Sequence, residues 1–132
     1  RQAWDMKRVI ETTDAPAAVG AYSQATTDGD LVFTAGQIPL TPDDELLDDE
    51  PIEVQTRQSL ENIKAILEEE GLTMQDVLKA TVLMDDITEF EQMNEAYKEY
   101  FQDNPPARSA FEVANLPKGV GVEIEAIAAQ RD

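Results

Sequence analysis

The chain has 132 residues, the length of a single domain, and 42% of them are hydrophobic, which is enough for a core of its own. It carries 28 acidic and 10 basic residues, so its formal net charge is −18. This charge disfavours nucleic acid and anionic membrane surfaces as partners, because contact with phosphates needs a basic footprint.

Two residue types are absent, and their absence narrows the available chemistry. The chain has no Cys and no His, which excludes disulfides, thiolate nucleophiles, imidazole bases and zinc sites of the usual kind. Catalysis would have to use carboxylates, Arg, Lys, Tyr, hydroxyls and backbone groups. No apolar run reaches transmembrane length and no signal-peptide pattern follows the N-terminus, so the cytoplasm is the expected compartment.

The acidic residues are densest in two segments, 43–53 and 85–103. A solvated acidic surface is the simplest interpretation. A protein of this charge repels itself at low ionic strength, and molar salt screens that repulsion, so we expect a host adapted to high salt. A calcium site or a mimic of nucleic-acid charge is the alternative, although the sequence lacks the EF-hand loop pattern.

The first five residues precede Met6, and we interpret them as an upstream extension or an expression remnant. No repeat or low-complexity linker divides the rest, so a single domain is expected over residues 6–132. Its first element is a short strand at 7–11.

A longer strand is predicted at 31–40, after a turn at 28–30. Gly36 inside this strand predicts either a β-bulge or the close approach of another group. Pro39 indicates that the strand is ending or lies at an edge. The acidic segment 41–50 is expected to be a loop.

The first helix is expected to begin near Pro51, a residue that suits the first helical position. Either Glu50 or Asp49 would then be the N-cap, and the pattern leaves this boundary open. Gly71 is expected to end the helix. Apolar residues recur at helical spacing and predict a buried stripe, made of Leu60, Ile63, Ile66 and Leu67.

The second half of the chain predicts a strand at 77–84 and a second helix after it. The pattern Thr88-x-x-Glu91 predicts a capping box at the start of that helix. Strands at 107–115 and 122–128 complete the chain and are joined by a hairpin-like turn.

This order of elements predicts an α+β fold in which both helices pack on one face of the sheet. A chain of this length has nothing left to cover the other face. We therefore expect an oligomer, because a large exposed apolar face is rare in monomers.

Arg108 is the first candidate for chemistry, because a guanidinium presents a rigid fork that suits a substrate carboxylate. An ion pair with one of the many acids is the alternative. Glu123 and Glu125 share one face of the last strand, and a carboxylate in a partly dry cleft can position or deprotonate water. A solvated strand face is the simpler interpretation. In a hairpin, Arg108 and Glu123 would border the same sheet face, although the loop length leaves their pairing open.

Three other residues are weaker candidates. Tyr22 could donate a phenolic hydrogen bond, although such residues more often pack with the hydroxyl satisfied. Gly36 could leave backbone amides open to a ligand, and Asn94 lies on the second helix, where an ordinary surface role is the alternative. Taken alone, these residues predict an acidic α+β domain with a carboxylate site.

Residues 106–120 read PARSAFEVANLPKGV and lead into VEIEAIA at 122–128, a pair of motifs that strongly resembles the YjgF/RidA family of reactive-intermediate (enamine/imine) deaminases. Three more segments are similar to the family: APAAVGAYSQA at 15–25, AGQIP at 35–39 and QSLENIKAIL at 58–67. The likeness covers nearly the whole chain.

The resemblance implies a chorismate-mutase-like mixed β-sheet with two helices packed on one face, in a homotrimer whose sites lie between subunits. It also implies a reaction. The enamines 2-aminoacrylate and 2-aminocrotonate tautomerise to imines, which the family hydrolyses to 2-keto acids and ammonia. A protonated imine is strongly electrophilic, so neither a metal nor a cofactor is expected.

The resemblance also assigns roles to single residues. Arg108 matches the arginine that binds the substrate carboxylate, Glu123 the glutamate that handles the attacking water, and Tyr22 the site tyrosine. Gly36 matches the glycine whose backbone borders the ligand.

Two substrate-binding positions follow the family less closely. Asn94 matches a helix position near the cleft. Many members carry Cys where this chain has Ala110, so a thiol is not required here.

Other functions remain as alternatives. One is a non-catalytic binder of small carboxylate metabolites, or a chaperone-like protein, on the same fold. Another is an RNA-cleaving family member, which the negative charge and the absence of His disfavour. A chorismate mutase is a third, fold-level alternative that the motifs do not favour.

Overall fold

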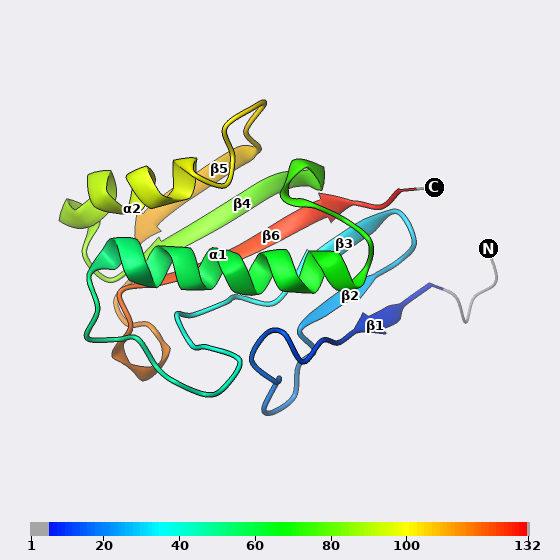
Figure 1. The fold of residues 1–132 in the computed structure, drawn as a ribbon, viewed down its shortest axis with the longest axis horizontal. Helices are drawn as coiled ribbons and strands as arrows, with labels where there is room; N and C mark the ends of the chain where they lie inside the picture. Colours follow the sequence, from blue (N-terminus) through cyan, green and yellow to red (C-terminus); the bar gives the residue numbers. More distant parts are fainter. Residues whose placement is uncertain (1–5, 132) are drawn as a thin grey trace.

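A computed structural model of the protein describes residues 6–131, and Figure 1 shows a sheet with two helices laid across it. The six strands follow the order β1-β2-β3-β6-β4-β5, and every neighbouring pair is antiparallel except β4 and β5. The strands are β1 (Arg8–Ile10), β2 (Ala25–Thr27), β3 (Leu31–Thr34), β4 (Val77–Met84), β5 (Ala107–Glu112) and β6 (Val122–Ala129).

Both α-helices, α1 (Ile52–Glu69) and α2 (Phe90–Lys98), lie on the same face of this sheet (Figure 1). The core fills the space between the two layers. The α+β class and the one-sided arrangement of the helices are as predicted. The single-domain assignment for 6–132 stays a prediction, and the expected extension at residues 1–5 lies outside the described residues.

Three short 3₁₀ helices complete the chain: η2 (Met74–Asp76), η3 (Ile87–Glu89) and η4 (Pro117–Gly119). None of the helices in the described part of the chain is long and apolar enough to cross a membrane.

The helix α1 has the buried stripe and the end that the sequence predicts. Its C-cap is Glu70, and Gly71 follows with a φ of +76°, a conformation that glycine adopts without strain. The Gly71 N–H donates to the Glu68 carbonyl at 3.0 Å, and the Leu72 N–H donates to the Leu67 carbonyl at 2.9 Å. These two bonds form a Schellman motif that satisfies the last carbonyls. The predicted stripe of Leu60, Ile63, Ile66 and Leu67 is buried.

The helix starts differ from both predictions. Pro51 is itself the N-cap of α1, with no side-chain capping bond, and neither Glu50 nor Asp49 takes that place. The capping box at Thr88 is wrong, because Asp86 caps η3 by accepting a bond from the Thr88 N–H at 3.0 Å. The short carboxylate of Asp86 reaches this N–H two residues on, so the chain turns before α2 begins.

The predicted strand at 31–40 ends at Thr34, and beyond it two of its residues form isolated antiparallel bridges, Gln37 with Ile124 and Leu40 with Leu46. The Gln37 N–H donates to the Ile124 carbonyl at 2.7 Å, and the Ile124 N–H donates back to the Gln37 carbonyl at 3.0 Å. The strand β2 was not predicted from the sequence, because three residues are too short for a clear alternation.

The expected hairpin between the last two strands is wrong. β5 pairs in parallel with β4, and β6 lies between β3 and β4. Ile124 and Ala126 of β6 are buried, which suits a central strand, whereas β5 carries the charged residues Arg108 and Glu112. Charged side chains are tolerated on an edge strand, which explains why β5 lies at the edge of the sheet.

No described element covers the sheet face opposite the helices, as the sequence predicts. Val9, Phe33 and Phe111 on that face are 47%, 43% and 48% exposed. The register places Phe33 beside Ile127 and Phe111 beside Leu83 on the same face. We call this surface the open face.

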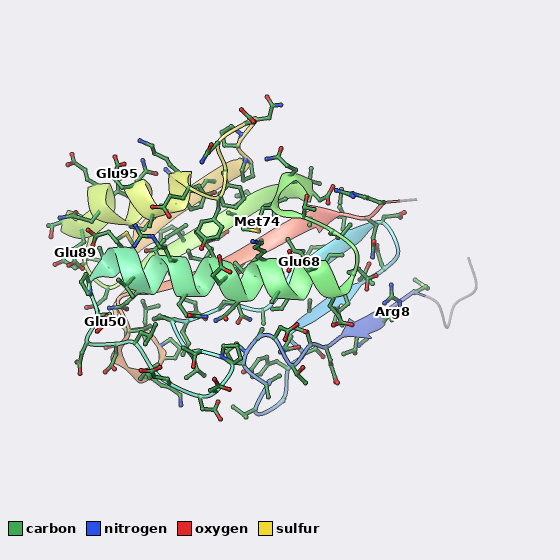
Figure 2. The ribbon with its side chains drawn as sticks, in the orientation of Figure 1. Arg8, Glu50, Glu68, Met74, Glu89 and Glu95 are labelled. Carbon is green, nitrogen blue, oxygen red and sulfur yellow. The ribbon has the colours of Figure 1, made fainter. Side chains whose placement is uncertain are left out.

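Acidic side chains stand out from the outer surfaces of both helices and from the loop before α1. Figure 2 labels Glu50, Glu68, Glu89 and Glu95, of which Glu89 is partly buried and the other three are exposed. Within residues 6–131 no group of three or more carboxylates is arranged to hold a metal ion.

Candidate functional site

The two principal candidates, Arg108 and Glu123, lie on opposite faces of the sheet. Arg108 is in register with Ala80, which faces the helices and is buried. Glu123 is in register with Leu83, three positions along the same strand β4 and therefore on the open face. The expectation that both residues border one sheet face is wrong, because β4 lies between their strands.

The distance between these two residues follows from strand geometry. Two inter-strand steps separate Arg108 from Glu123 across β4, and the register offsets them by three residues along the strands. Their Cα atoms are therefore on the order of 14 Å apart. A single small substrate cannot touch both side chains of one chain.

Arg108 belongs to a group that β5 and α2 bring together, which we call the Arg108 cluster: Arg108, Asn94, Phe90 and Tyr97. Arg108 Nη1 donates a hydrogen bond to Asn94 Oδ1 at 2.7 Å. The guanidinium carbon lies 4.6 Å from the centre of the Tyr97 ring and 5.3 Å from that of Phe90. The cluster borders a cavity of about 320 Å³, lined by Asn94, Tyr97, Lys98, Phe101, Pro105, Pro106 and Arg108.

No carboxylate of residues 6–131 forms an ion pair with Arg108. The four ion pairs of that range are Arg8–Glu70, Arg57–Glu99, Lys98–Glu95 and Arg131–Asp76. The alternative interpretation, an arginine neutralised by a neighbouring acid, is therefore wrong within the described chain. A cation at a cavity without a counter-ion is suited to bind an anion.

A second group, the Glu123 cluster, consists of Glu123, Gly36 and Tyr22, which come from β6 and from two loops. These residues border a larger cavity of about 670 Å³. The remaining lining is mostly apolar and includes Pro16, Ala17, Val19, Ile38, Leu40 and Pro117. The structure thus brings three of the predicted site residues together and leaves Arg108 and Asn94 in the other cluster.

Gly36 lies against the side chain of Glu123. A Cβ atom at Gly36 would lie 2.8 Å from Glu123 Cδ and closer still to Oε2, far inside van der Waals contact. The two backbone bonds between Gln37 and Ile124 hold the loop at this distance. The close approach predicted at Gly36 is confirmed, and the approaching group is a carboxylate.

The pKa of Glu123 is raised above its ordinary value. Burial is the larger cause, because it removes water from the charged form, and the negative charge of Glu125 is the second. A carboxylate of raised pKa accepts a proton more readily, which suits a group that takes a proton from water.

Tyr22 is exposed rather than packed in the core, with 52% of its surface accessible. The Val19 N–H donates a hydrogen bond to its hydroxyl oxygen at 3.4 Å. That bond leaves the phenolic proton available to a ligand in the cavity.

Ala110 lies two residues beyond Arg108 on the same side of β5, in register with Val82. It packs against the hydrophobic core and lines neither cavity. Its role in substrate binding stays a prediction.

Sequence reasoning missed three residues of the two clusters and their cavities: Phe90, which lies against the Arg108 guanidinium, Tyr97, which lines the Arg108 cavity, and Lys118, which lines the Glu123 cavity. Phe90 and Tyr97 are apolar residues at helical spacing, which by itself predicts only a buried stripe, although their spacing with Asn94 places all three on one face. Lys118 was assigned to a turn, and it borders the Glu123 cavity with a φ of 58°, in the left-handed region. The turn sequence Pro117-Lys118-Gly119 carries no signal of such a position.

Comparisons with known proteins all point to the same protein family. The family model described as Endoribonuclease L-PSP matches residues 12–130. A RutC family protein of Pyrococcus horikoshii is 53% identical over 93% of this chain and 98% of its own. The 2-iminobutanoate/2-iminopropanoate deaminase of Rattus norvegicus is 46% identical over 95% of this chain and 91% of its own.

A solved structure gives the same result. The crystal structure of Escherichia coli TdcF with bound serine has a TM-score of 0.88 and 45% identity, and the match covers 94% of this chain and 99% of that one. The family model spans most of the chain, and the relatives align over nearly their whole length. The chain therefore belongs to the YjgF/RidA family.

Proposed function

We propose that this protein is a hydrolytic deaminase that converts 2-imino acids, formed from 2-aminoacrylate and 2-aminocrotonate, into 2-keto acids and ammonia. One observation carries the proposal: a cation without a counter-ion and a carboxylate of raised pKa each border a cavity. These are the two groups that imine hydrolysis requires.

The chemistry follows from the charges of the substrate. Arg108 binds the substrate carboxylate through N–H donors that its bond to Asn94 leaves free. Glu123 accepts a proton from water as the water oxygen bonds to the imine carbon, and the C=N bond becomes single. Glu123 then returns the proton to nitrogen. As the C–N bond breaks, the hydroxyl passes its proton to Glu123 and becomes the carbonyl of the keto acid. The keto acid leaves, and the departing ammonia takes the proton from Glu123, which restores the carboxylate. The rate gain is mainly one of orientation.

The site must be shared between subunits for this reaction to occur. The carboxylate and the imine carbon of the substrate are bonded to one another, whereas Arg108 and Glu123 of one chain lie on opposite sheet faces. We therefore propose that the Arg108 cluster of one subunit meets the Glu123 cluster of the next. The assembly we propose is a homotrimer with a chorismate-mutase-like arrangement, in which neighbouring subunits cover the open face.

Two relatives support the substrate class. The rat relative is named for 2-iminobutanoate and 2-iminopropanoate, and the TdcF structure holds serine, an amino acid with a carboxylate of the same kind. Their sequences align with nearly all of this chain.

A subunit-mixing experiment tests the function and the shared site together. Arg108→Ala and Glu123→Gln should each abolish most release of keto acid from enzymatically generated 2-aminoacrylate. When the two variants are co-refolded in equal amounts, one shared site in four regains both residues, so activity should recover to about a quarter of wild type. No recovery, with both variants folded and assembled, would refute the shared site. Wild-type rates in either variant would refute its catalytic role.

Two other functions can be distinguished from the deaminase by experiment. A non-catalytic binder would retain affinity for a keto acid and release no ammonia. The family model is described by an endoribonuclease activity, so RNA cleavage is worth testing with Arg108→Ala as control. The net charge of −18 disfavours RNA, because the phosphate backbone would be repelled.

A further inference from the structure

One face of α2 forms a cradle for the Arg108 guanidinium. Phe90, Asn94 and Tyr97 are spaced i, i+4 and i+7, which places them in a single stripe along the helix. The guanidinium carbon lies 4.6 Å and 5.3 Å from the two ring centres, within the range of cation–π attraction. Asn94 accepts one hydrogen bond at 2.7 Å.

The cradle stabilises the charge of Arg108 without neutralising it. Guanidinium has five N–H donors, and the described residues occupy Nη1 through Asn94 alone. Aromatic faces attract a cation but accept none of its in-plane bonds, so stacking leaves the N–H fork available. A carboxylate in place of a ring would fill that fork and compete with substrate.

Tyr97 contributes its ring and not its hydroxyl. The residue is only 4% exposed, and its buried hydroxyl has no hydrogen-bond partner within residues 6–131. Phe101 supports the ring, with the two ring centres 4.6 Å apart and the planes tilted by 39°. The guanidinium thus rests on a ring that is itself held in place by the core.

We propose that Tyr97, assisted by Phe90, is a positioning residue that orients the Arg108 guanidinium for the substrate carboxylate. This inference rests on the proposed function of Arg108. It assigns the effect to the aromatic face, so a ring without a hydroxyl should serve equally well. The Tyr97 ring lies closer to the guanidinium than the Phe90 ring and should contribute more.

The test compares variants at these two positions in the assembled enzyme. Tyr97→Phe should leave KM and kcat within about twofold of wild type, because only an unpartnered hydroxyl is lost. Tyr97→Leu should raise KM for the imine roughly tenfold with a smaller change in kcat, since a desolvated cation–π contact is lost. Phe90→Leu, at a less buried position, should raise KM by a few fold. Binding of 2-oxobutanoate, a stable carboxylate probe, should weaken in parallel.

Tyr100→Leu is the matched control. Tyr100 lies in the turn after α2, but its hydroxyl bonds to Glu61 and to the Arg57 carbonyl rather than to the Arg108 cluster. If Tyr97→Leu and Tyr100→Leu reduce only stability and active fraction, with KM unchanged, the positioning role is wrong. If Phe90→Leu leaves KM and probe binding unchanged, its part in the cradle is wrong.

Arg108→Ala separates this inference from the proposed function. Unchanged probe binding and turnover in that variant would overturn the proposed role of Arg108, and the inference with it. Loss of both, together with a normal KM in Tyr97→Leu, would overturn the inference alone.

Discussion

The Arg108 cluster and the Glu123 cluster handle charge in opposite ways. The cation lies among neutral groups, two aromatic rings and an amide, on a strand and a helix. The carboxylate is half-buried beside a second acid and is approached by a loop glycine. The first arrangement keeps a positive charge available for an anion, and the second prepares a carboxylate to accept a proton. Neither charge is compensated by the other within one chain.

The two clusters also depend on different structural features. The Arg108 cluster depends on side-chain stacking, which a conservative substitution can preserve. The Glu123 cluster depends on the absence of a side chain at residue 36, because the Glu123 carboxylate occupies the space that a Cβ atom there would need. Substitutions should therefore affect the two clusters in different ways.

The largest effect should come from Arg108→Ala. It removes two charge-assisted hydrogen bonds to the substrate, each contributing about 1.5–3 kcal/mol, so kcat/KM should fall by roughly 100-fold or more. The protein should remain folded and keep the assembly of the wild type, because no ion pair of the described chain is broken. Arg57→Ala is the control: Arg57 is paired with Glu99 on the surface, and its loss should leave turnover nearly unchanged. Equal losses in both variants would contradict the assignment.

Gly36→Ala should give the next largest effect. The added methyl group displaces the Glu123 carboxylate, a flexible group that can move, so turnover should fall at least about tenfold while the free energy of unfolding changes by less than about 1 kcal/mol. In a Glu123→Gln background the same substitution should have little further effect on activity. A fully additive loss would show that Gly36 acts independently of Glu123.

Gly121→Ala provides the matched glycine control. A Cβ there would lie 2.9 Å from Ile52 Cδ1 and 3.2 Å from Gln55 Oε1, at the start of α1, and these neighbours belong to neither cluster. It should lower thermal stability and leave the activity of the folded protein unchanged, the reverse of Gly36→Ala.

Salt should change the thermal stability of the whole protein, and therefore of both clusters. With a net charge of −18, the chain repels itself, and molar KCl reduces the Debye length to about 3 Å. The melting temperature should rise by about 5 °C or more between low salt and 2 M KCl. A melting temperature that is flat or falling would remove the hypothesis of salt adaptation. KM for the anionic imine should fall over the same range.

The smallest effect should follow Glu125→Gln. Glu123 must be ionised to accept a proton, so activity is lost as pH falls through its raised pKa. Removing the Glu125 charge lowers the pKa of Glu123, and burial still holds it above the ordinary value. The acid limb of the kcat/KM profile should move to lower pH, with less than about a twofold change near neutrality. A limb that moves to higher pH would contradict the proposed role of Glu123.

Much of the fold could be predicted because its signals are local. The stripe of α1 follows from a 3.6-residue period, and its end at Gly71 follows from the φ that glycine alone adopts easily. The alternation of β6 identified which of its residues are buried and placed Glu123 on the opposite face. Residue types and motifs identified Arg108 and Glu123 as candidates.

The arrangement of the candidates could not be predicted, because it depends on which strands pair. The segment between β5 and β6 looks like a hairpin turn, yet β6 pairs with β3 and β4. Local turn chemistry does not reveal which strand lies at the centre of the sheet. The centre favours β6, whose helix-facing side is buried, over β5, which carries Arg108. The two candidates consequently lie on opposite faces rather than on one.

The amino-acid sequence by itself determined the helices, most of the strands, the acidic surface and the residue types available for chemistry, since each depends on neighbours within a few positions. Only the tertiary structure decided the strand order, the contact of Gly36 with the Glu123 carboxylate and the stacking of Arg108 on Tyr97. These features join residues far apart in the chain, and their free energy comes from burial and packing that no local pattern encodes.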